Sequence, residues 1–202
     1  MRTERYLCLA GALFLLLFAP VETFAEEGKM EKATFAAGCF WGVEKVFSAM
    51  PGVTFTQVGY TGGRVPDPTY EQVCTGLTGH AEAIEMTYDP SQIDYETLLE
   101  VFFRHHDSTT LNRQGADVGT QYRSAIFYHS PEQLEAAKKT IAVLEKSKIF
   151  KNSIVTTLEP TSPFYRAEEY HQKYLKKHPM GYCALQLQSS KIGQVLQAAR
   201  KN

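Results

Sequence analysis

Alternating apolar and polar positions predict the strands of this chain. Runs that alternate in this way, or that are rich in β-branched and aromatic residues, are typical of half-buried strands. They occur at residues 32–37, 53–60, 83–88, 124–128 and 154–158.

Apolar residues at helical spacing, together with start and stop signals, predict four helices. The first covers residues 43–50 and ends at Pro51-Gly52. The second begins after Asp94 and carries Leu98, Leu99, Phe102 and Phe103 on one face. The third begins at Ser130-Pro131, an N-cap followed by a first-turn proline, with Gln133 at the capping-box position. The fourth covers 167–177.

The order of these elements predicts the fold class. It is β-α-β-β-α-β followed by α-β-α, and the first six elements match a split β-α-β arrangement. We therefore expect an α+β, two-layer sandwich: a mainly antiparallel sheet with helices on one face, built on a ferredoxin-like core with C-terminal additions. Two long polar loops, residues 61–80 and 106–121, interrupt this pattern, and loops of that length are commonly functional.

Residues 1–25 are expected to be a secretory signal peptide, leaving residues 26–202 as the catalytic domain. Arg2 and Arg5 precede an apolar stretch of roughly 14 residues, which is shorter than the ~20 needed to span a membrane. Pro20 ends it, and Thr23-Phe24-Ala25 is an acceptable cleavage site. The prediction is an exported, periplasmic protein, with an uncleaved membrane anchor as the alternative.

Composition describes one globular domain and narrows the function classes. The chain has 202 residues, 44 % of them hydrophobic and 21 % charged, with a formal net charge of −1. No clustered basic run is present, which argues against nucleic acid as a partner. Of the 4 cysteines, Cys8 falls in the predicted signal, so Cys39, Cys74 and Cys183 remain. An odd number suits one redox pair and one bystander better than a structural disulfide framework.

Cys39 is the strongest candidate for a reactive group. It lies at a predicted strand-to-helix junction, where backbone N–H groups and the helix dipole are expected to favour a thiolate. Gly38 and Gly42 leave room for a substrate, and Phe40 and Trp41 offer apolar faces suited to a methyl group. The alternative is a buried, inert cysteine, which is common in proteins.

The sequence around Cys39 and four other runs resembles the A-type peptide methionine sulfoxide reductases. The resemblance covers roughly residues 34–183. It rests on residues 37–44 (AGCFWGVE), 59–63 (GYTGG), 78–83 (TGHAEA), 117–124 (DVGTQYRS) and 178–183 (HPMGYC). Five such runs in the same order are strongly specific.

The resemblance implies reduction of the S epimer of methionine sulfoxide, free or in a polypeptide, without metal or organic cofactor. Cys39 matches the nucleophile and Glu82 the acid that protonates the sulfoxide oxygen. Tyr70 and Tyr122 match the phenols that help to bind this oxygen. The remaining substrate contacts would be Phe40 and Trp41 for the ε-methyl group and Asp117 for the substrate's main chain or its supporting loop.

Physical chemistry supports the acid role independently. A sulfoxide oxygen is a poor leaving group until it is protonated, so a thiol nucleophile needs an acid nearby. The usual carboxyl pKa near 4.3 must then be raised, which burial beside aromatic residues accomplishes. A solvent-facing strand position is the alternative for Glu82, and ordinary loop packing is the alternative for the two tyrosines.

A second thiol is needed to condense with the Cys39 sulfenic acid. By resemblance this resolving cysteine is Cys183, with Cys74 as the competitor. Residues 184–188 (ALQLQ) replace the glycines of some relatives, and no cysteine follows. We therefore expect the Cys39–Cys183 disulfide to be reduced directly by a thioredoxin-like protein. Separately, the enzyme is expected to be a monomer.

Two other functions remain open at the level of sequence. A cysteine hydrolase or acyltransferase would use His80 as its base. A binding module would use the aromatic residues as a cage and leave the thiol incidental. His105-His106-Asp107 resembles a metal cluster, but adjacent residues seldom share one ion, so a role at a helix end is expected.

Overall fold

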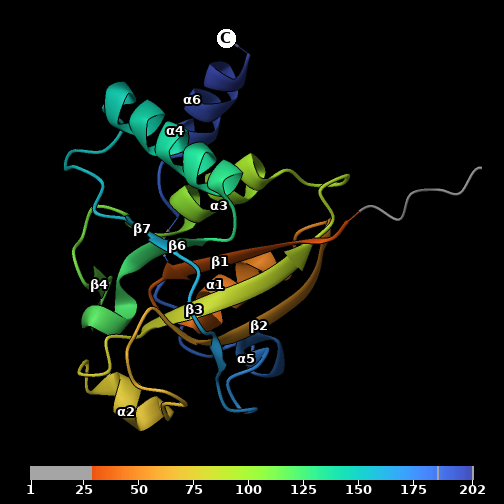
Figure 1. Ribbon diagram of the computed structural model, residues 1–202. Coiled ribbons are helices and arrows are strands. Elements are labelled where there is room, and N and C mark those ends of the chain that lie inside the picture. The colour runs from red at the N-terminus through yellow and green to blue at the C-terminus, as the bar shows by residue number, and fades with distance from the viewer. Residues whose placement is uncertain (1–28, 186, 202) are drawn as a thin grey trace, which may run out of the picture.

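A six-stranded sheet forms the centre of the computed structural model, which describes residues 29–185 and 187–201 (Figure 1). The predicted signal peptide lies outside the described residues. The strands are β1 (Glu31–Ala37), β2 (Val53–Thr61), β3 (Ala81–Tyr88), β6 (Ser124–Tyr128), β7 (Thr157–Pro160) and β8 (Tyr165–Arg166), and a separate hairpin consists of β4 (Arg113–Gln114) and β5 (Asp117–Val118). The helices are α1 (Phe40–Phe47), α2 (Tyr70–Cys74), α3 (Tyr95–His105), the 3-10 turn η1 (Thr120–Tyr122), α4 (Pro131–Ser147), α5 (Tyr174–Lys177) and α6 (Lys191–Arg200).

The sheet is mostly antiparallel, as expected. Its strand order is β7-β6-β1-β3-β2-β8, and β6 with β7 is the parallel pair among these neighbours. Tyr60 of β2 lies opposite Glu82 of β3, so the ends of these two strands bring both side chains to the same place. The fold is thus a mixed α/β domain that includes a six-stranded sheet.

Helices cover one face of the sheet. Phe35, Ile84 and Met86 of the central strands pack against α1, α3, α4 and α6 in the main hydrophobic core. Figure 1 shows α3, α4 and α6 gathered on one side of the sheet. On the other face, small residues such as Ala36 and Ala83 pack with Phe127 and the partly buried Phe164. The alternation read from the sequence therefore separates the two faces correctly.

The predicted N-caps of two helices are confirmed, but the capping box expected from Gln133 is not formed, because its side chain accepts from His129 N and not from Ser130 N. The Asp94 side chain accepts a hydrogen bond from Thr97 N at 2.7 Å and caps α3. Ser130 caps α4 in the same way, by accepting from Gln133 N at 3.3 Å. His105 ends α3, and His106 follows it with one ring nitrogen 2.7 Å from Phe102 O and the other 2.7 Å from Ser124 Oγ.

Other predicted boundaries were wrong. The first helix begins at Phe40 rather than Val43, so Phe40 and Trp41 belong to its first turn. The strand expected at 154–158 lies at Thr157–Pro160. The helix expected at 167–177 is reduced to Tyr174–Lys177, because Lys173 has a φ of 54° and interrupts it.

The sequence reading also missed two helices. Thr69 and Gln72 form a capping box around α2, inside the loop expected at 61–80. The C-terminal α6 carries Ile192, Val195 and Leu196 at helical spacing and packs on α3 and α4.

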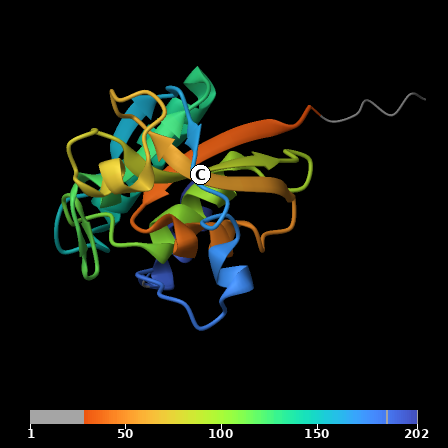
Figure 2. The same ribbon diagram turned by 90° about the horizontal axis from the view of Figure 1, so that it is seen from below.

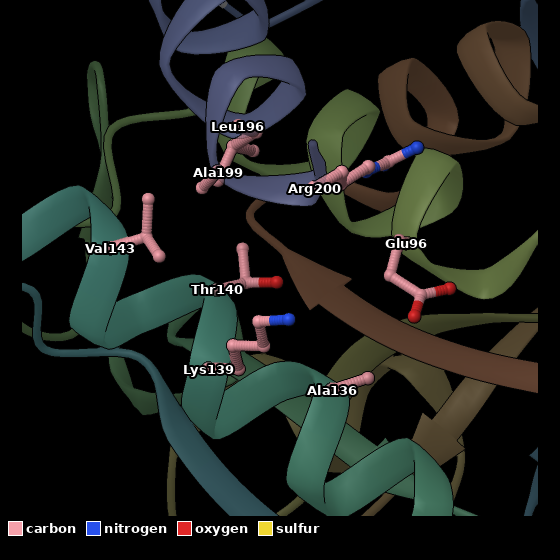
Figure 3. Close-up of a pocket in the computed structure, with 8 residues that line it drawn as sticks. All are labelled: Glu96, Ala136, Lys139, Thr140, Val143, Leu196, Ala199 and Arg200. Carbon is pink, nitrogen blue, oxygen red and sulfur yellow. The ribbon is translucent and has the colours of Figure 1, made fainter. Parts of the chain in front are cut away.

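A cavity of about 60 Å³ remains beside the junction of α6 with α4, and Figure 3 shows Lys139 and Thr140 of α4 facing Leu196 and Ala199 of α6 across it. Arg200 Nη1 lies 3.5 Å from Asp94 Oδ1, which ties the end of α6 to the start of α3.

In the described part of the chain, no helix is long and apolar enough to cross a membrane.

Candidate active site

Cys39 occupies the N-cap position of α1, directly after β1. Gly38 turns the chain there with a φ of 86°, a left-handed conformation that side chains rarely tolerate. A Cβ atom at Gly38 would lie 2.5 Å from Gln114 Cβ, so space also requires glycine. The turn therefore presents the sulfur at the amino end of the helix, where the Trp41 N–H hydrogen-bonds it.

The Cys39 thiol is buried and protonated in this state. Only 8 % of the residue is exposed, and burial, followed by the negative charge of Glu82, raises the pKa of the thiol far above its usual value. The hydrogen bond from Trp41 N–H lowers the pKa of the thiol, but by less than burial raises it. The expectation that the helix end favours a thiolate is thus wrong here, because desolvation outweighs the dipole and the hydrogen bond.

Glu82 lies beside Cys39 at the start of β3. Its Oε2 accepts a hydrogen bond from Phe40 N at 3.1 Å, and the residue is 1 % exposed. Burial raises its pKa to about 8, against the lowering effect of the Phe40 hydrogen bond. At neutral pH the carboxyl group is therefore mostly protonated and able to donate a proton.

Two phenols lie near this pair. Burial, followed by the charge of Glu82, raises the pKa of Tyr122, and the charge of Asp117 adds to this. Burial, a hydrogen bond to Cys74 and the charge of Glu82 raise the pKa of Tyr70. Both hydroxyls thus stay protonated and can serve as uncharged donors.

Asp117 is joined to the site from the β4–β5 hairpin. Its Oδ1 accepts a hydrogen bond from the Tyr182 hydroxyl at 3.0 Å, and its Oδ2 is buried with no partner among the described residues. Its charge contributes to raising the pKa of Cys39 and of Glu82. The carboxylate therefore faces the same space as the nucleophile and the acid.

An aromatic cluster forms the wall next to Cys39. Phe40 is buried and packs with Tyr60 and His171, at ring-centroid distances of 6.0 and 5.0 Å. Trp41 stacks on Tyr174 at 3.8 Å, and its Nε1–H donates to His171 Nδ1 at 3.0 Å. This bond fixes His171 as the neutral ring with its proton on the other nitrogen.

Residues 168–171 could be either a solvated helix face or, by the family resemblance, a supporting contact near the site, and the structure shows the contact; Tyr60 was not expected there. Glu168 accepts hydrogen bonds from the Tyr60 hydroxyl at 2.8 Å and from Tyr70 N at 3.0 Å, and so joins β2 to α2. The sequence could have placed Tyr60 on the same face of the sheet as the apolar Val58, because the two residues are two positions apart in a predicted strand. Glu168 and His171 lie outside any helix, so the helix expected at 167–177 could not predict where their side chains point.

Cys183 lies close to α1, one turn beyond Cys39. A Cβ atom at Gly42 would be 2.9 Å from Cys183 Sγ and 2.8 Å from Leu185 Cγ. Gly42 therefore leaves space for the C-terminal segment against the helix. Cys183 is exposed and reduced in this structure.

Cys74, the other candidate, is exposed at the end of α2. Its sulfur accepts a hydrogen bond from the Tyr70 hydroxyl. Cys183 thus lies against α1 and acts on the Cys39 thiol, whereas Cys74 lies beside the Tyr70 phenol.

His80 does not serve as a base for Cys39. It is buried, and its Nδ1 accepts from Gly63 N at 3.1 Å while its Nε2 donates to Val65 O at 2.8 Å. Because both ring nitrogens are bound to the loop, the hydrolase alternative lacks its base.

Among residues 29–185 and 187–201, no three His, Cys, Asp or Glu side chains are grouped so as to hold a metal ion.

Comparison with known proteins gives a consistent result. Residues 31–201 match the family model described as peptide methionine sulfoxide reductase. A protein of Methanothermobacter thermautotrophicus named peptide methionine sulfoxide reductase MsrA is 59 % identical over 157 residues, which are 78 % of this chain and 93 % of that protein.

Solved structures agree with this match. The crystal structure of Mxr1 from Saccharomyces cerevisiae in reduced form is 40 % identical, with a TM-score of 0.73, over 81 % of this chain and 95 % of the other. Mxr1 in complex with Trx2 is similar at 27 % identity, with a TM-score of 0.53, over 81 % and 94 % of the two chains.

Proposed function

Because this chain belongs to the A-type peptide methionine sulfoxide reductases, a family of oxidoreductases, we propose that it reduces the S epimer of methionine sulfoxide, free and in proteins, and so repairs oxidised proteins. The observation that carries the proposal is the pairing of a buried thiol with a buried carboxyl group. Phe40 N, in the residue after Cys39, lies 3.1 Å from Glu82 Oε2. Nucleophile and acid thus reach one small space.

The first chemical step transfers the sulfoxide oxygen to Cys39. Glu82 donates its proton to this oxygen and recovers one from the thiol. The attacking sulfur therefore becomes negatively charged only as protonation neutralises the sulfoxide oxygen. The bond between the methionine sulfur and oxygen breaks, and the oxygen ends on Cys39 as a sulfenic acid. Methionine, now reduced, leaves.

The other site residues bind the substrate. Tyr122 donates a hydrogen bond to the sulfoxide oxygen, and Tyr70 does so once its hydroxyl turns from Cys74 to the substrate; the raised pKa keeps both phenols protonated. Phe40 and Trp41 hold the ε-methyl group. The unpartnered Oδ2 of Asp117 accepts a hydrogen bond from the main chain of the substrate.

The second step forms a disulfide between Cys39 and Cys183 with release of water. Support comes from the position of Cys183 Sγ against Gly42, one helical turn from Cys39. A thioredoxin-like protein then reduces the disulfide. The complex of the similar Mxr1 with Trx2 supports a reductant of this kind.

We also propose a split β-α-β core. Strands β6, β1, β3 and β2 are neighbours in that order and pair antiparallel, and α1 and α3 contact the same hydrophobic core.

Export as a periplasmic monomer remains a proposal from the sequence. N-terminal sequencing of the protein from cells tests it: a first residue near Glu26 supports cleavage, and Met1 contradicts it.

An epimer-resolved assay tests the reductase activity. Purified protein with dithiothreitol is expected to convert the S epimer of methionine sulfoxide to methionine and to leave the R epimer unchanged, because the methyl wall and the oxygen donors accept one hand of the sulfur. Methionine is measured by chromatography. A protein that binds the sulfoxide but yields no methionine would be a binding module, and the proposal would fail.

Replacing Cys183 by serine is expected to leave one fast turnover and then stop the reaction with thioredoxin. The first step needs only Cys39 and Glu82, whereas recycling needs a second thiol to form the disulfide that thioredoxin reduces. Rapid-quench measurement of methionine against enzyme concentration shows the single turnover. Cys74→Ser is the matched control and should cycle normally. Sustained thioredoxin-linked turnover by Cys183→Ser would assign the resolving role to Cys74.

A further inference from the structure

A hollow of about 420 Å³ lies against α1. Trp41 and Lys45 line it from one face of the helix, and Ser48 and Ala49 line it from the turn that follows. Lys173 and the helix α5 that follows it close the other side. Figure 2 shows α1 and α5 next to each other, in orange and mid-blue, and an α1–α5 packing contact agrees with this view.

The hollow has an excess of positive charge. Lys45, Lys173 and Lys176 line it, and Glu44 is its acidic residue. Glu44 is buried, and its carboxylate already accepts from Lys173 Nζ at 3.1 Å and from Lys173 N at 2.6 Å. Its charge is therefore compensated within the fold.

Lys45 and Lys176 supply the remaining charge. Both are exposed, and neither forms an ion pair with another described residue. The carboxyl end of α1 offsets about half a charge at most, which is less than two full charges. A net positive surface is left beside the apolar side chains of Trp41 and Leu175.

We propose that this lysine hollow binds acidic residues that flank the oxidised methionine in polypeptide substrates. The proposal rests on the proposed function, and Trp41 makes the connection: it packs in the aromatic cluster around Cys39 and also lines the hollow. A polypeptide whose sulfoxide reaches Cys39 therefore passes the hollow on one side. The volume lies within the range of about 300–1,000 Å³ that is usual for ligand sites.

Helix geometry sets where the acidic residue should be. Lys45 is four residues beyond Trp41, or about 6 Å along the axis, and Ala49, in the turn after the helix, is roughly twice as far. An extended chain advances about 3.3 Å per residue. The acidic side chain should thus lie two to four positions from the methionine sulfoxide, on one side of it.

Short peptides test this proposal. Each contains one methionine S-sulfoxide and a single Glu, Gln or Lys at a position two to four residues before or after it. On one side, Glu should raise kcat/KM about three- to tenfold over Gln through KM, and Lys should lower it, as expected for exposed ion pairs. High salt should remove the difference.

The double variant Lys45→Gln/Lys176→Gln should lose the preference for Glu and keep its activity on free methionine sulfoxide. Lys138→Gln/Lys139→Gln, two exposed lysines of α4, is the matched control and should keep the preference. Equal kcat/KM for Glu, Gln and Lys peptides, or a preference that survives in the Lys45/Lys176 variant, would overturn the lysine hollow. Absence of turnover of free methionine S-sulfoxide by the unaltered protein would instead refute the reductase function.

Discussion

Replacing Cys39 by serine should reduce methionine formation to the level of the reaction without enzyme. The serine hydroxyl still accepts the hydrogen bond from Trp41 N–H at the start of α1, so the fold should be retained. An alcohol is, however, a far weaker nucleophile than a thiol and does not form the sulfenic acid that carries the oxygen.

Single-turnover assays with the S epimer provide the measurement. The unaltered protein without reductant should gain one oxygen on Cys39 or a disulfide, detected by mass spectrometry of its peptides, and Cys39→Ser should show neither. Cys74→Ser controls for the loss of any thiol near the phenols and should keep the first step. Methionine formation by Cys39→Ser would move the nucleophile to another cysteine.

Replacing Glu82 by glutamine should slow the formation of the Cys39 sulfenic acid by about 10²–10⁴-fold, the usual contribution of a positioned acid. The glutamine oxygen can still accept from Phe40 N, so the local fold and substrate binding should persist. What is lost is the proton for the sulfoxide oxygen. Rapid-quench measurement of the first methionine formed reports this step directly.

The pH dependence gives the same role an independent test. The carboxyl pKa is raised to about 8, so the proton-bearing form is complete well below pH 8 and disappears as the pH rises above it. The rate of the first step should therefore fall at alkaline pH with an apparent pKa of about 8, and this fall should be absent in Glu82→Gln.

Glu85→Gln is the matched control. Glu85 lies on the same strand, three residues further on, and accepts from Lys32 Nζ at 3.1 Å and Gln57 Nε2 at 2.9 Å on the other face of the sheet. It should react at the normal rate with the normal pH profile. A normal rate in Glu82→Gln as well would refute the acid role.

The protonation state of the site changes how the thiol is understood. Burial keeps both Cys39 and Glu82 uncharged before substrate binds, although the helix end and the Trp41 N–H favour the anion. A resting thiol of this kind is protected from oxidants, because the thiolate is the reactive form. The Cys39 thiol therefore loses its proton only after the sulfoxide has bound, when its oxygen can take the proton of Glu82.

The sequence by itself determined the elements whose signals are local. Alternation at 83–88 and the caps at Asp94 and Ser130 identified a strand and two helices, because side-chain periodicity and cap hydrogen bonds depend on a few neighbouring residues. The runs around Cys39 and Glu82 identified the family through resemblance. The alternation along β3 also explains why Glu82, Ile84 and Met86 share the helical face of the sheet.

Tertiary structure alone decided the segment at 167–177 and the state of the thiol. The Gln172 side chain bonds to both Val58 N and Val58 O, at 3.0 and 2.9 Å, and thereby holds the edge of β2 in place of continuing a helix. Glu168 and His171 are likewise directed into the site by partners more than ninety residues away. Such contacts outweigh local helix propensity, which is worth only fractions of a kcal/mol per residue. The pKa values of Cys39 and Glu82 follow the same rule, since burial depends on which strands and loops the whole chain brings around them.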